Sequence, residues 1–273
     1  DYELQIKEQV LEDGGHFELS HMYQNIIIED IADILNILNH SKLFKKNLSK
    51  ILIKMIRWSN VLTNANEELF YVNDTVDGIS KSTLQLNEYI SQLLKKNKTH
   101  LFSKGEKAIT TLSESGFSNI RSKSFFLNIN HANLKATYIP GHFHADTFSF
   151  EISNSKGKII CNPGLSTYTE SNERLEERGT LSHNCLSVDR ENSSEIWKSF
   201  RLGRAAEVIS LSSNTINSQS IISASHNGFK DAIHKRTWNI TDDLVEIHDD
   251  VTSSQSKIIL INFLLHPSFK IIA

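Results

Sequence analysis

A change of hydrophobic period along the chain is the feature that most constrains its fold. In the first hundred residues, apolar side chains recur three and four positions apart, which places them on one face of a helix. The first such stripe comprises Ile27, Ile31, Ile34, Leu35 and Leu38. After about residue 120 the pattern becomes a two-residue alternation, which is typical of half-buried β-strands. The sequence therefore predicts helices followed by strands.

Two more helices are predicted in the first half. Ser82 followed by Gln85 is the capping-box pattern expected at the start of the later one. Residues 95–107 are polar and basic, which indicates a domain boundary. We therefore expect a helical domain over residues 1–104 and a β domain over residues 105–273. The two further stripes comprise Leu48, Leu52, Met55, Ile56 and Leu62, and then Leu84, Ile90, Leu93 and Leu94.

The β domain is predicted to be an antiparallel sandwich. Phe148, Phe150 and Ile152 alternate with polar residues, and a turn at 154–157 leads into a returning strand at 158–161. Many short strands separated by turns are typical of a sandwich. Further strand-like runs occupy residues 185–189, 207–211, 221–225, 232–240, 244–251 and 257–265.

Composition and chain ends exclude some functional classes. The net charge of −3 lacks the basic surplus of a nucleic-acid binder, and no apolar run has the length of a membrane helix. Cys161 and Cys185 form no CxxC motif, so they are predicted to be buried thiols, with a disulfide as the alternative. The chain starts at Asp1 without a signal peptide and stops inside a predicted strand, so we expect a fragment, truncated at its C-terminus.

The densest chemical signal is the run Gly-His-Phe-His-Ala-Asp at residues 141–146. On a strand, His142 and His144 would face the same side, so one can bind a metal while the other faces a substrate. Asn162 follows the next predicted strand, and residues 178–184, which include His183, would open another. Each histidine alone is more simply a structural residue, but their concentration at strand ends favours a site.

Six segments resemble the heparinase II/III family, in the family's own order. The run DGGHFELSHMY at residues 13–23 resembles the pattern D-G-G-x-F-E-L-S-P-M-Y-H. FYVND at 70–74 resembles an F-N-D segment that the family has in a helix hairpin. The others are GHFHADTFSF at 141–150, ICNPGLSTY at 160–168, RGTLSHNCLSVD at 178–189 and EIWKSFRLGRA at 195–205.

The resemblance implies an (α/α) toroid, incomplete here, followed by an antiparallel β-sandwich, with the active site between them. It implies a polysaccharide lyase that cleaves a uronic-acid-containing acidic polysaccharide by β-elimination, in the periplasm or cell envelope. Tyr23 matches the catalytic tyrosine, and His142 matches the family's base or neutraliser of the substrate carboxylate. A free phenol has a pKa of about 10, so Tyr23 needs less help to act as an acid than as a base.

The resemblance also implies binding residues. Asn73, Tyr168 and Arg178 are the expected substrate contacts, whereas Arg201 and Arg204 are more simply structural. A divalent metal, with zinc the expected ion, would be held by His144, Asn162 and His183 and would support the site. Glu18 is expected to order the loop before Tyr23.

Departures from the family pattern keep two alternatives open. Asn162 stands where the family usually has an aspartate ligand, Gln24 stands in place of a histidine, and His21 in place of a proline. An inactive or weak relative that binds polysaccharide in surface-glycan metabolism is therefore the alternative to an active lyase. A metal-dependent hydrolase is disfavoured, because Asp146 follows His144 but no further histidine does.

Overall fold

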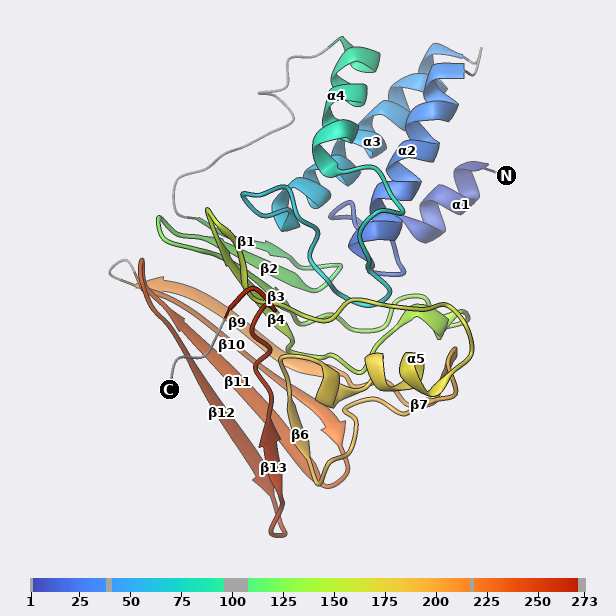
Figure 1. Ribbon diagram of the computed structural model, residues 1–273. Helices are drawn as coiled ribbons and strands as arrows, with labels where there is room; N and C mark the ends of the chain where they lie inside the picture. The colour runs from blue at the N-terminus through green and yellow to red at the C-terminus, as the bar shows by residue number, and fades with distance from the viewer. Residues whose placement is uncertain (1, 38–40, 96–107, 217–218, 270–273) are drawn as a thin grey trace.

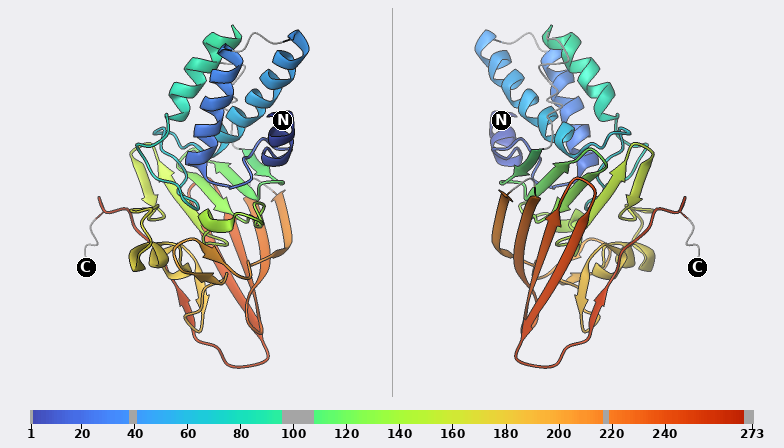
Figure 2. Two further views of the ribbon diagram at one scale, coloured as in Figure 1. Left: turned by 90° about the vertical axis from the view of Figure 1, so that its right-hand side faces the viewer. Right: turned by 90° about the vertical axis from the view of Figure 1, so that its left-hand side faces the viewer.

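The computed structural model describes residues 2–37, 41–95, 108–216 and 219–269, and it places helices before strands (Figure 1). The helices lie together at one end of an antiparallel β-sandwich. Figure 2 shows the same stacking of the two halves in views turned by 90°. The predicted fold class is therefore confirmed. Leu38 and the predicted domain boundary at residues 104 and 105 lie outside the described residues.

Four helices form the first half: α1 (Tyr2–Gln9), α2 (His21–Ile37), α3 (Lys42–Leu62) and α4 (Thr83–Leu94). Their apolar stripes meet in one core, because residues three and four positions apart project from the same face. Ser82 and Gln85 form the predicted capping box at the start of α4. Within the described ranges, no helix combines the length and the apolar character needed to cross a membrane. The buried core includes Ile28, Ile31, Leu52, Ile56, Leu86 and Ile90.

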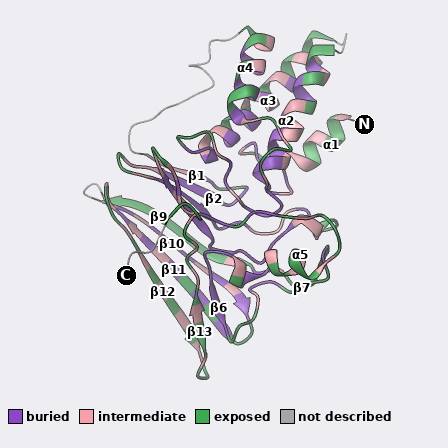
Figure 3. Ribbon diagram, viewed as in Figure 1, coloured by how far each residue is buried: buried purple, intermediate pink, exposed green. Residues whose placement is uncertain are grey.

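Two antiparallel sheets pack face to face in the second half. The first has the order β1 (Ala108–Leu112), β2 (Phe117–Arg121), β3 (Phe126–Asn130), β4 (Phe150–Asn154) and β5 (Gly157–Ile160). The second has the order β12 (Val245–Ser253), β11 (Ala232–Ile240), β10 (Gln219–Phe229) and β9 (Val208–Ile216). Burial alternates along β10 and β11 (Figure 3), as expected where one face covers the core. The core between the sheets includes Ile120, Leu127, Phe150, Ile222 and Trp238.

Smaller elements connect these sheets and surround the candidate site. They are η2 (Pro140–His142), α5 (Asn172–Glu177), η3 (Thr180–Ser182), the hairpin of β7 (Ile196–Trp197) and β8 (Arg201–Leu202), and the pair β6 (Leu186–Val188) and β13 (Ile259–Ile261). Cys161 and Cys185 are free and buried, as predicted.

The strand predicted to carry His142 and His144 is absent from this part of the described chain. His142 ends the short 3-10 helix η2, which starts at Pro140, a residue with a fixed φ and no N–H for a strand ladder. Phe148 was expected in the next strand but has a left-handed φ of 69°, so β4 begins only at Phe150. The alternating pattern therefore extended the predicted strands too far.

Two other short segments were also singled out in the sequence. Residues 178–184 do lead into the strand predicted at 185–189, which is β6, but they form the end of α5 and η3. Residues 70–74 were expected in a helix hairpin but form an irregular segment between α3 and α4. Asn73 has a φ of 50° there, in the left-handed region that asparagine tolerates better than most residues.

A hydrogen-bonded junction joins the helices to the first sheet. Trp58 of α3 packs edge-on against Phe117 of β2, and its Nε1 donates to Ser115 Oγ at 2.8 Å. The Asp13 carboxylate accepts from the Ser115 backbone N–H at 2.7 Å. A Cβ at Gly15 would lie 2.7 Å from the Trp58 indole nitrogen, so this close approach requires glycine. The junction fixes the loop that leads into α2.

Candidate active site

Tyr23 and His142 approach each other across the junction. Tyr23 lies in the first turn of α2, and His142 ends η2 in the β domain. Their ring centroids are 4.8 Å apart with an interplanar angle of 30°. Ser20 immediately precedes α2. Its hydroxyl accepts from the Tyr23 N–H at 3.3 Å and donates to the Asp74 carbonyl at 3.0 Å. The start of α2 is thereby tied to the irregular segment before α4.

Two carboxylates face the His142 ring. Nδ1 lies 3.0 Å from Glu18 Oε2, and Nε2 lies 4.0 Å from Asp74 Oδ2. Because a carboxylate accepts, Nδ1 carries the proton and Nε2 is left without a hydrogen bond of ordinary length. Burial lowers the pKa of His142, but the hydrogen bond to Glu18 and the charges of Asp74 and Glu18 outweigh it, so the pKa is raised.

The phenol of Tyr23 has a second aromatic neighbour. Its hydroxyl donates to the Tyr168 hydroxyl at 3.0 Å. Burial, the hydrogen bond to Tyr168 and the charges of Asp74 and Glu18 raise the pKa of Tyr23 well above its usual range. Tyr23 therefore holds its proton at neutral pH and is suited to donate it. Tyr168 is 40% exposed, so this pair opens to solvent.

Asp74 lies at the centre of the site and is fully buried. One of its oxygens lies 2.8 Å from His144 Nε2, and the other accepts from Arg174 Nη2 at 2.7 Å. Burial raises the pKa of Asp74, but its hydrogen bonds to His144 and Arg174 outweigh burial, so the pKa is lowered. The Asp74 carboxylate is therefore an anion that faces both histidines of the 141–146 run.

Two of the three residues predicted as metal ligands, His144 and His183, lie near each other. The rings of His144 and His183 have centroids 5.4 Å apart. Among the described residues, His144 Nδ1 and both ring nitrogens of His183 are buried and make no hydrogen bond of ordinary geometry. Asn162 Oδ1 accepts from the N–H and from Nδ2 of Asn184, both at 3.3 Å. Within the described ranges, no three side chains drawn from His, Cys, Asp and Glu form a metal-binding group.

Asn73 and Arg178, two of the predicted substrate contacts, are occupied by the protein itself. Asn73 donates to the Leu19 carbonyl and accepts from the His144 N–H, both at 3.0 Å. Arg178 is fully buried, and its closest hydrogen bond runs to the Phe143 carbonyl at 2.7 Å. Their geometry favours a role in shaping the site. Only Tyr168 of the three predicted contacts is exposed beside Tyr23.

The departures from the family pattern have structural roles. His21 is buried, with Nε2 3.0 Å from Ser59 Oγ and Nδ1 accepting from the Phe70 N–H at 3.1 Å. The Gln24 side-chain oxygen accepts from the His16 N–H, and its Nε2 donates to the carbonyls of Gly14 and Met55. His21 therefore does not take the place of a histidine beside Tyr23.

Three other charged residues noted in the sequence, Arg201, Arg204 and Asp146, have the following surroundings. Arg204 donates to the Gly228 carbonyl at 2.7 Å, in keeping with the structural reading, and Arg201 is exposed on β8. Asp146 is buried and accepts from Asn130 at 3.0 Å; burial raises its pKa to about 6. An Asp146 engaged in this way does not offer the open metal position that the hydrolase alternative needs.

Sequence reasoning missed two members of the site. Asp74 closes the FYVND run, but only its neighbour Asn73 was singled out. Arg174 lies in a charged stretch with no motif, and its side chain is fully buried. The aspartate that ends the F-N-D resemblance was the available signal for Asp74, whereas nothing in the sequence marked Arg174.

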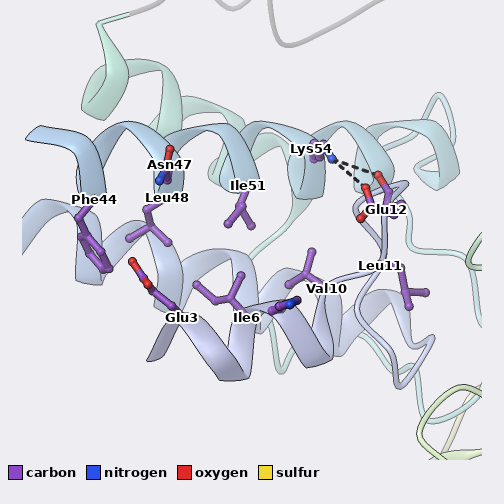
Figure 4. A pocket seen from close by; sticks show the side chains of 11 residues that line it. Glu3, Ile6, Val10, Leu11, Glu12, Phe44, Asn47, Leu48, Ile51 and Lys54 are labelled. Carbon is purple, nitrogen blue, oxygen red and sulfur yellow. Dashed lines mark hydrogen bonds and ion pairs between the residues drawn. The ribbon is translucent and has the colours of Figure 1, made fainter. Parts of the chain in front are cut away.

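Two hollows lie away from the Tyr23–His142 pair. A groove of about 340 Å³ between α1 and α3 (Figure 4) has walls that include Ile6, Phe44 and Ile51, and the Lys54–Glu12 ion pair lies at one end. A larger hollow of about 820 Å³ beside the β7–β8 hairpin is lined by Trp197 and by charges of both signs. Neither lining includes a residue of the candidate site.

Comparisons with solved structures match the fold. The chain superposes on a heparinase III gene product with a TM-score of 0.81 and 18% identity, covering 99% of this chain and 43% of that one. A second structure, titled heparinase III, gives 0.79 and 14%, covering 96% and 44%. A heparan sulfate lyase from Pedobacter heparinus gives 0.79 and 16%, covering 97% and 42%. The chain thus spans less than half the length of these proteins.

Sequence models of protein families match almost the whole chain. The model described as Heparinase II/III N-terminus matches residues 2–103, and the model described as Heparinase II/III-like, C-terminal matches residues 104–273. No curated protein matches the chain. Because the second match alone covers more than half of the sequence, the chain belongs to the heparinase II/III family.

Proposed function

We propose that this chain carries the catalytic core of a lyase that cleaves a uronic-acid-containing polysaccharide by β-elimination. The observation that supports the proposal is the approach of the Tyr23 phenol and the His142 imidazole from two halves of the molecule. Solved structures of the same fold include proteins titled heparinase III and heparan sulfate lyase. We further propose the periplasm or cell envelope as its location.

The reaction requires two proton transfers, one from C5 and one to the glycosidic oxygen on the adjacent C4. A base removes the proton from C5 of the uronate, and the electron pair of the C5–H bond forms the C4–C5 double bond. The bond from C4 to the glycosidic oxygen breaks, and an acid protonates the departing oxygen. A base and an acid on neighbouring side chains serve both transfers without a large movement.

Tyr23 is assigned as the acid and His142 as the base. The raised pKa of Tyr23 keeps its proton in place until the leaving oxygen accepts it. Glu18 holds the Nδ1 proton of His142, so the Nε2 lone pair is the free acceptor. The pair of Glu18 and His142 thus resembles the carboxylate–imidazole arrangement of other general bases, in which the carboxylate fixes the tautomer.

The donor set is consistent with a divalent metal, expected to be zinc, held by His144, His183 and Asn162. Among the described residues, His144 Nδ1 and the ring nitrogens of His183 are buried and make no hydrogen bond of ordinary geometry, and Asp74 on the opposite nitrogen of His144 is the usual support of a metal-binding imidazole. A bound metal would neutralise local charge and stiffen the β-domain wall. The Asn162 amide is a weaker ligand than a carboxylate, so we expect weak binding.

The deciding experiment measures the ultraviolet absorbance of the unsaturated product on heparan sulfate and alginate. Turnover that is lost in Tyr23→Phe and kept in Tyr89→Phe, whose tyrosine lies on α4 beside Asp33, supports the lyase. Turnover retained by Tyr23→Phe rejects it. Binding of either polysaccharide without turnover would favour the alternative, a polysaccharide-binding relative, to which the Asn162 substitution points.

A further inference from the structure

The side chain of Arg174 is a buried cation at the back of the candidate site. It is fully buried; its guanidinium donates to Asp74 of the helical half and to carbonyls of the β domain. A buried charge is costly unless it is paired and hydrogen-bonded, so a buried arginine with many partners holds those partners in a defined arrangement.

The guanidinium binds the residue just before each of three aromatic groups: His142, Tyr168 and Phe200. Nη2 donates to the Gly141 carbonyl at 3.4 Å, next to His142. Nη1 donates to the Thr167 carbonyl at 3.4 Å, next to Tyr168. Nε donates to the Ser199 carbonyl at 2.9 Å, next to Phe200.

The same group also packs between two aromatic rings. Its Cζ lies 4.2 Å from the Phe200 ring centroid and 5.3 Å from that of Tyr168. Cations over aromatic faces are attracted by the ring quadrupole. Tyr168 in turn accepts the hydrogen bond of the Tyr23 hydroxyl. One guanidinium therefore contacts the supports of both members of the Tyr23–His142 pair.

We propose that Arg174 is a positioning residue, whose planar fork fixes Asp74, the η2 turn before His142 and the loop before Tyr168 in one arrangement. The proposal rests on the lyase function but adds a residue that touches neither Tyr23 nor His142. Lysine cannot replace it, because an ammonium is a point charge and lacks the five N–H donors of the fork.

The test compares Arg174→Lys with Arg236→Lys in the full chain. Arg236 is also fully buried and also pairs with a carboxylate, that of Asp249, at 2.7 Å. Within the described part of the chain, its other hydrogen bonds run to the carbonyls of Phe148 and Asn184, and not to Asp74 or to the segments before His142 and Tyr168. We expect Arg174→Lys to lower kcat on heparan sulfate or alginate at least tenfold with KM changed less than threefold. Arg236→Lys should keep kcat within twofold while losing a similar amount of thermal stability.

A second readout does not depend on turnover. The His142 side chain is 31% exposed, so its carbethoxylation by diethyl pyrocarbonate can be followed by peptide mass spectrometry. We expect the rate at His142 to rise at least threefold in Arg174→Lys and to stay unchanged in Arg236→Lys. A wild-type chain with no turnover would reject the lyase while leaving this readout to decide the role of Arg174.

Unchanged kcat together with an unchanged His142 rate in Arg174→Lys would overturn the proposal. If Arg174→Lys does not fold, the double variant Asp74→Asn/Arg174→Met takes its place in the same two measurements. The double variant removes both buried charges together. A double variant that folds with wild-type kcat and an unchanged His142 rate would equally overturn the proposal.

Discussion

The Tyr23 phenol lies against the His142 imidazole with ring centroids 4.8 Å apart, although one residue belongs to a helix and the other to the β domain. Neither side chain is placed by its own element alone. The Trp58–Ser115 contact fixes the helices on the first sheet, and the Asp74–Arg174 pair fixes the segments behind the two rings. The site is therefore a product of the junction.

The first prediction concerns the coupling of Tyr23 and His142. Tyr23→Phe and His142→Asn should each lower kcat by about 10²–10⁴-fold, the usual contribution of general acid–base groups. The double variant should lose little more than the worse single variant, because the two groups act as one unit. Initial rates of product absorbance measure all three. Losses that multiply in the double variant would show that the two residues act independently.

The second prediction concerns Glu18. Glu18→Gln replaces the carboxylate that accepts the Nδ1 proton of His142 with a neutral amide, so the tautomer with a free Nε2 is less strongly favoured. We expect kcat to fall about tenfold, or roughly 1.4 kcal/mol of transition-state stabilisation. Glu12→Gln is the control, because Glu12 is exposed and forms only a surface pair with Lys54. Equal activities of the two variants would remove Glu18 from the site.

The third prediction concerns the metal ligands. Asn162→Asp gives the proposed ligand set a carboxylate in place of an amide, and a charged oxygen binds zinc more tightly than an amide. Zinc affinity measured by calorimetry should rise at least tenfold over the wild-type chain. His183→Gln should abolish binding in either background, whereas His248→Gln on the exposed part of β12 should not. Equal zinc affinity in wild type and Asn162→Asp would contradict this ligand set.

The fourth prediction concerns stability at low pH. Burial lowers the pKa of His131 from 6.5 to about 4, although carbonyls of His131 and Phe117 oppose the shift. The unfolded chain therefore binds a proton that the folded chain does not. The stabilisation is complete above pH 6.5 and is lost as the pH falls toward 4, at up to about 1.4 kcal/mol per pH unit.

His131→Gln removes the group whose proton binding differs between the unfolded and the folded chain. Between pH 6.5 and 4, urea unfolding should show a pH slope shallower than that of the wild type by as much as one proton. His248→Gln serves as the control for the substitution itself. A slope in His131→Gln equal to that of the wild type would mean that burial does not control this histidine.

Much of the architecture could be predicted from local sequence. The spacing of Ile31, Leu52 and Ile90 places each on the apolar face of its helix, and Ser82 with Gln85 starts α4 as expected. The run 232–240 coincides with β11. These features follow from periods of 3.6 and 2 residues and from capping, which depend on neighbours along the chain.

Other features could not be predicted from local pattern. The Gly-His-Phe-His run fits a strand by alternation, yet Pro140 turns it into η2, and it is Asp74 that brings the two histidines to one side. Arg178 lies in a segment that resembles a family motif, but its guanidinium donates to backbone carbonyls such as that of Phe143. Whether such a side chain is accessible to a substrate depends on segments that are distant in the sequence.

The sequence by itself determined the order of helices and strands, the family, and the identity of Tyr23 and His142 as the pair to examine. Only the tertiary structure decided that the pair meets, that Asp74 and Arg174 stand behind it, and that Asn73 and Arg178 are already occupied. The physical reason is that periodicity and capping act between near neighbours. Burial of charge and the pairing of polar groups instead depend on which remote segments the fold brings together.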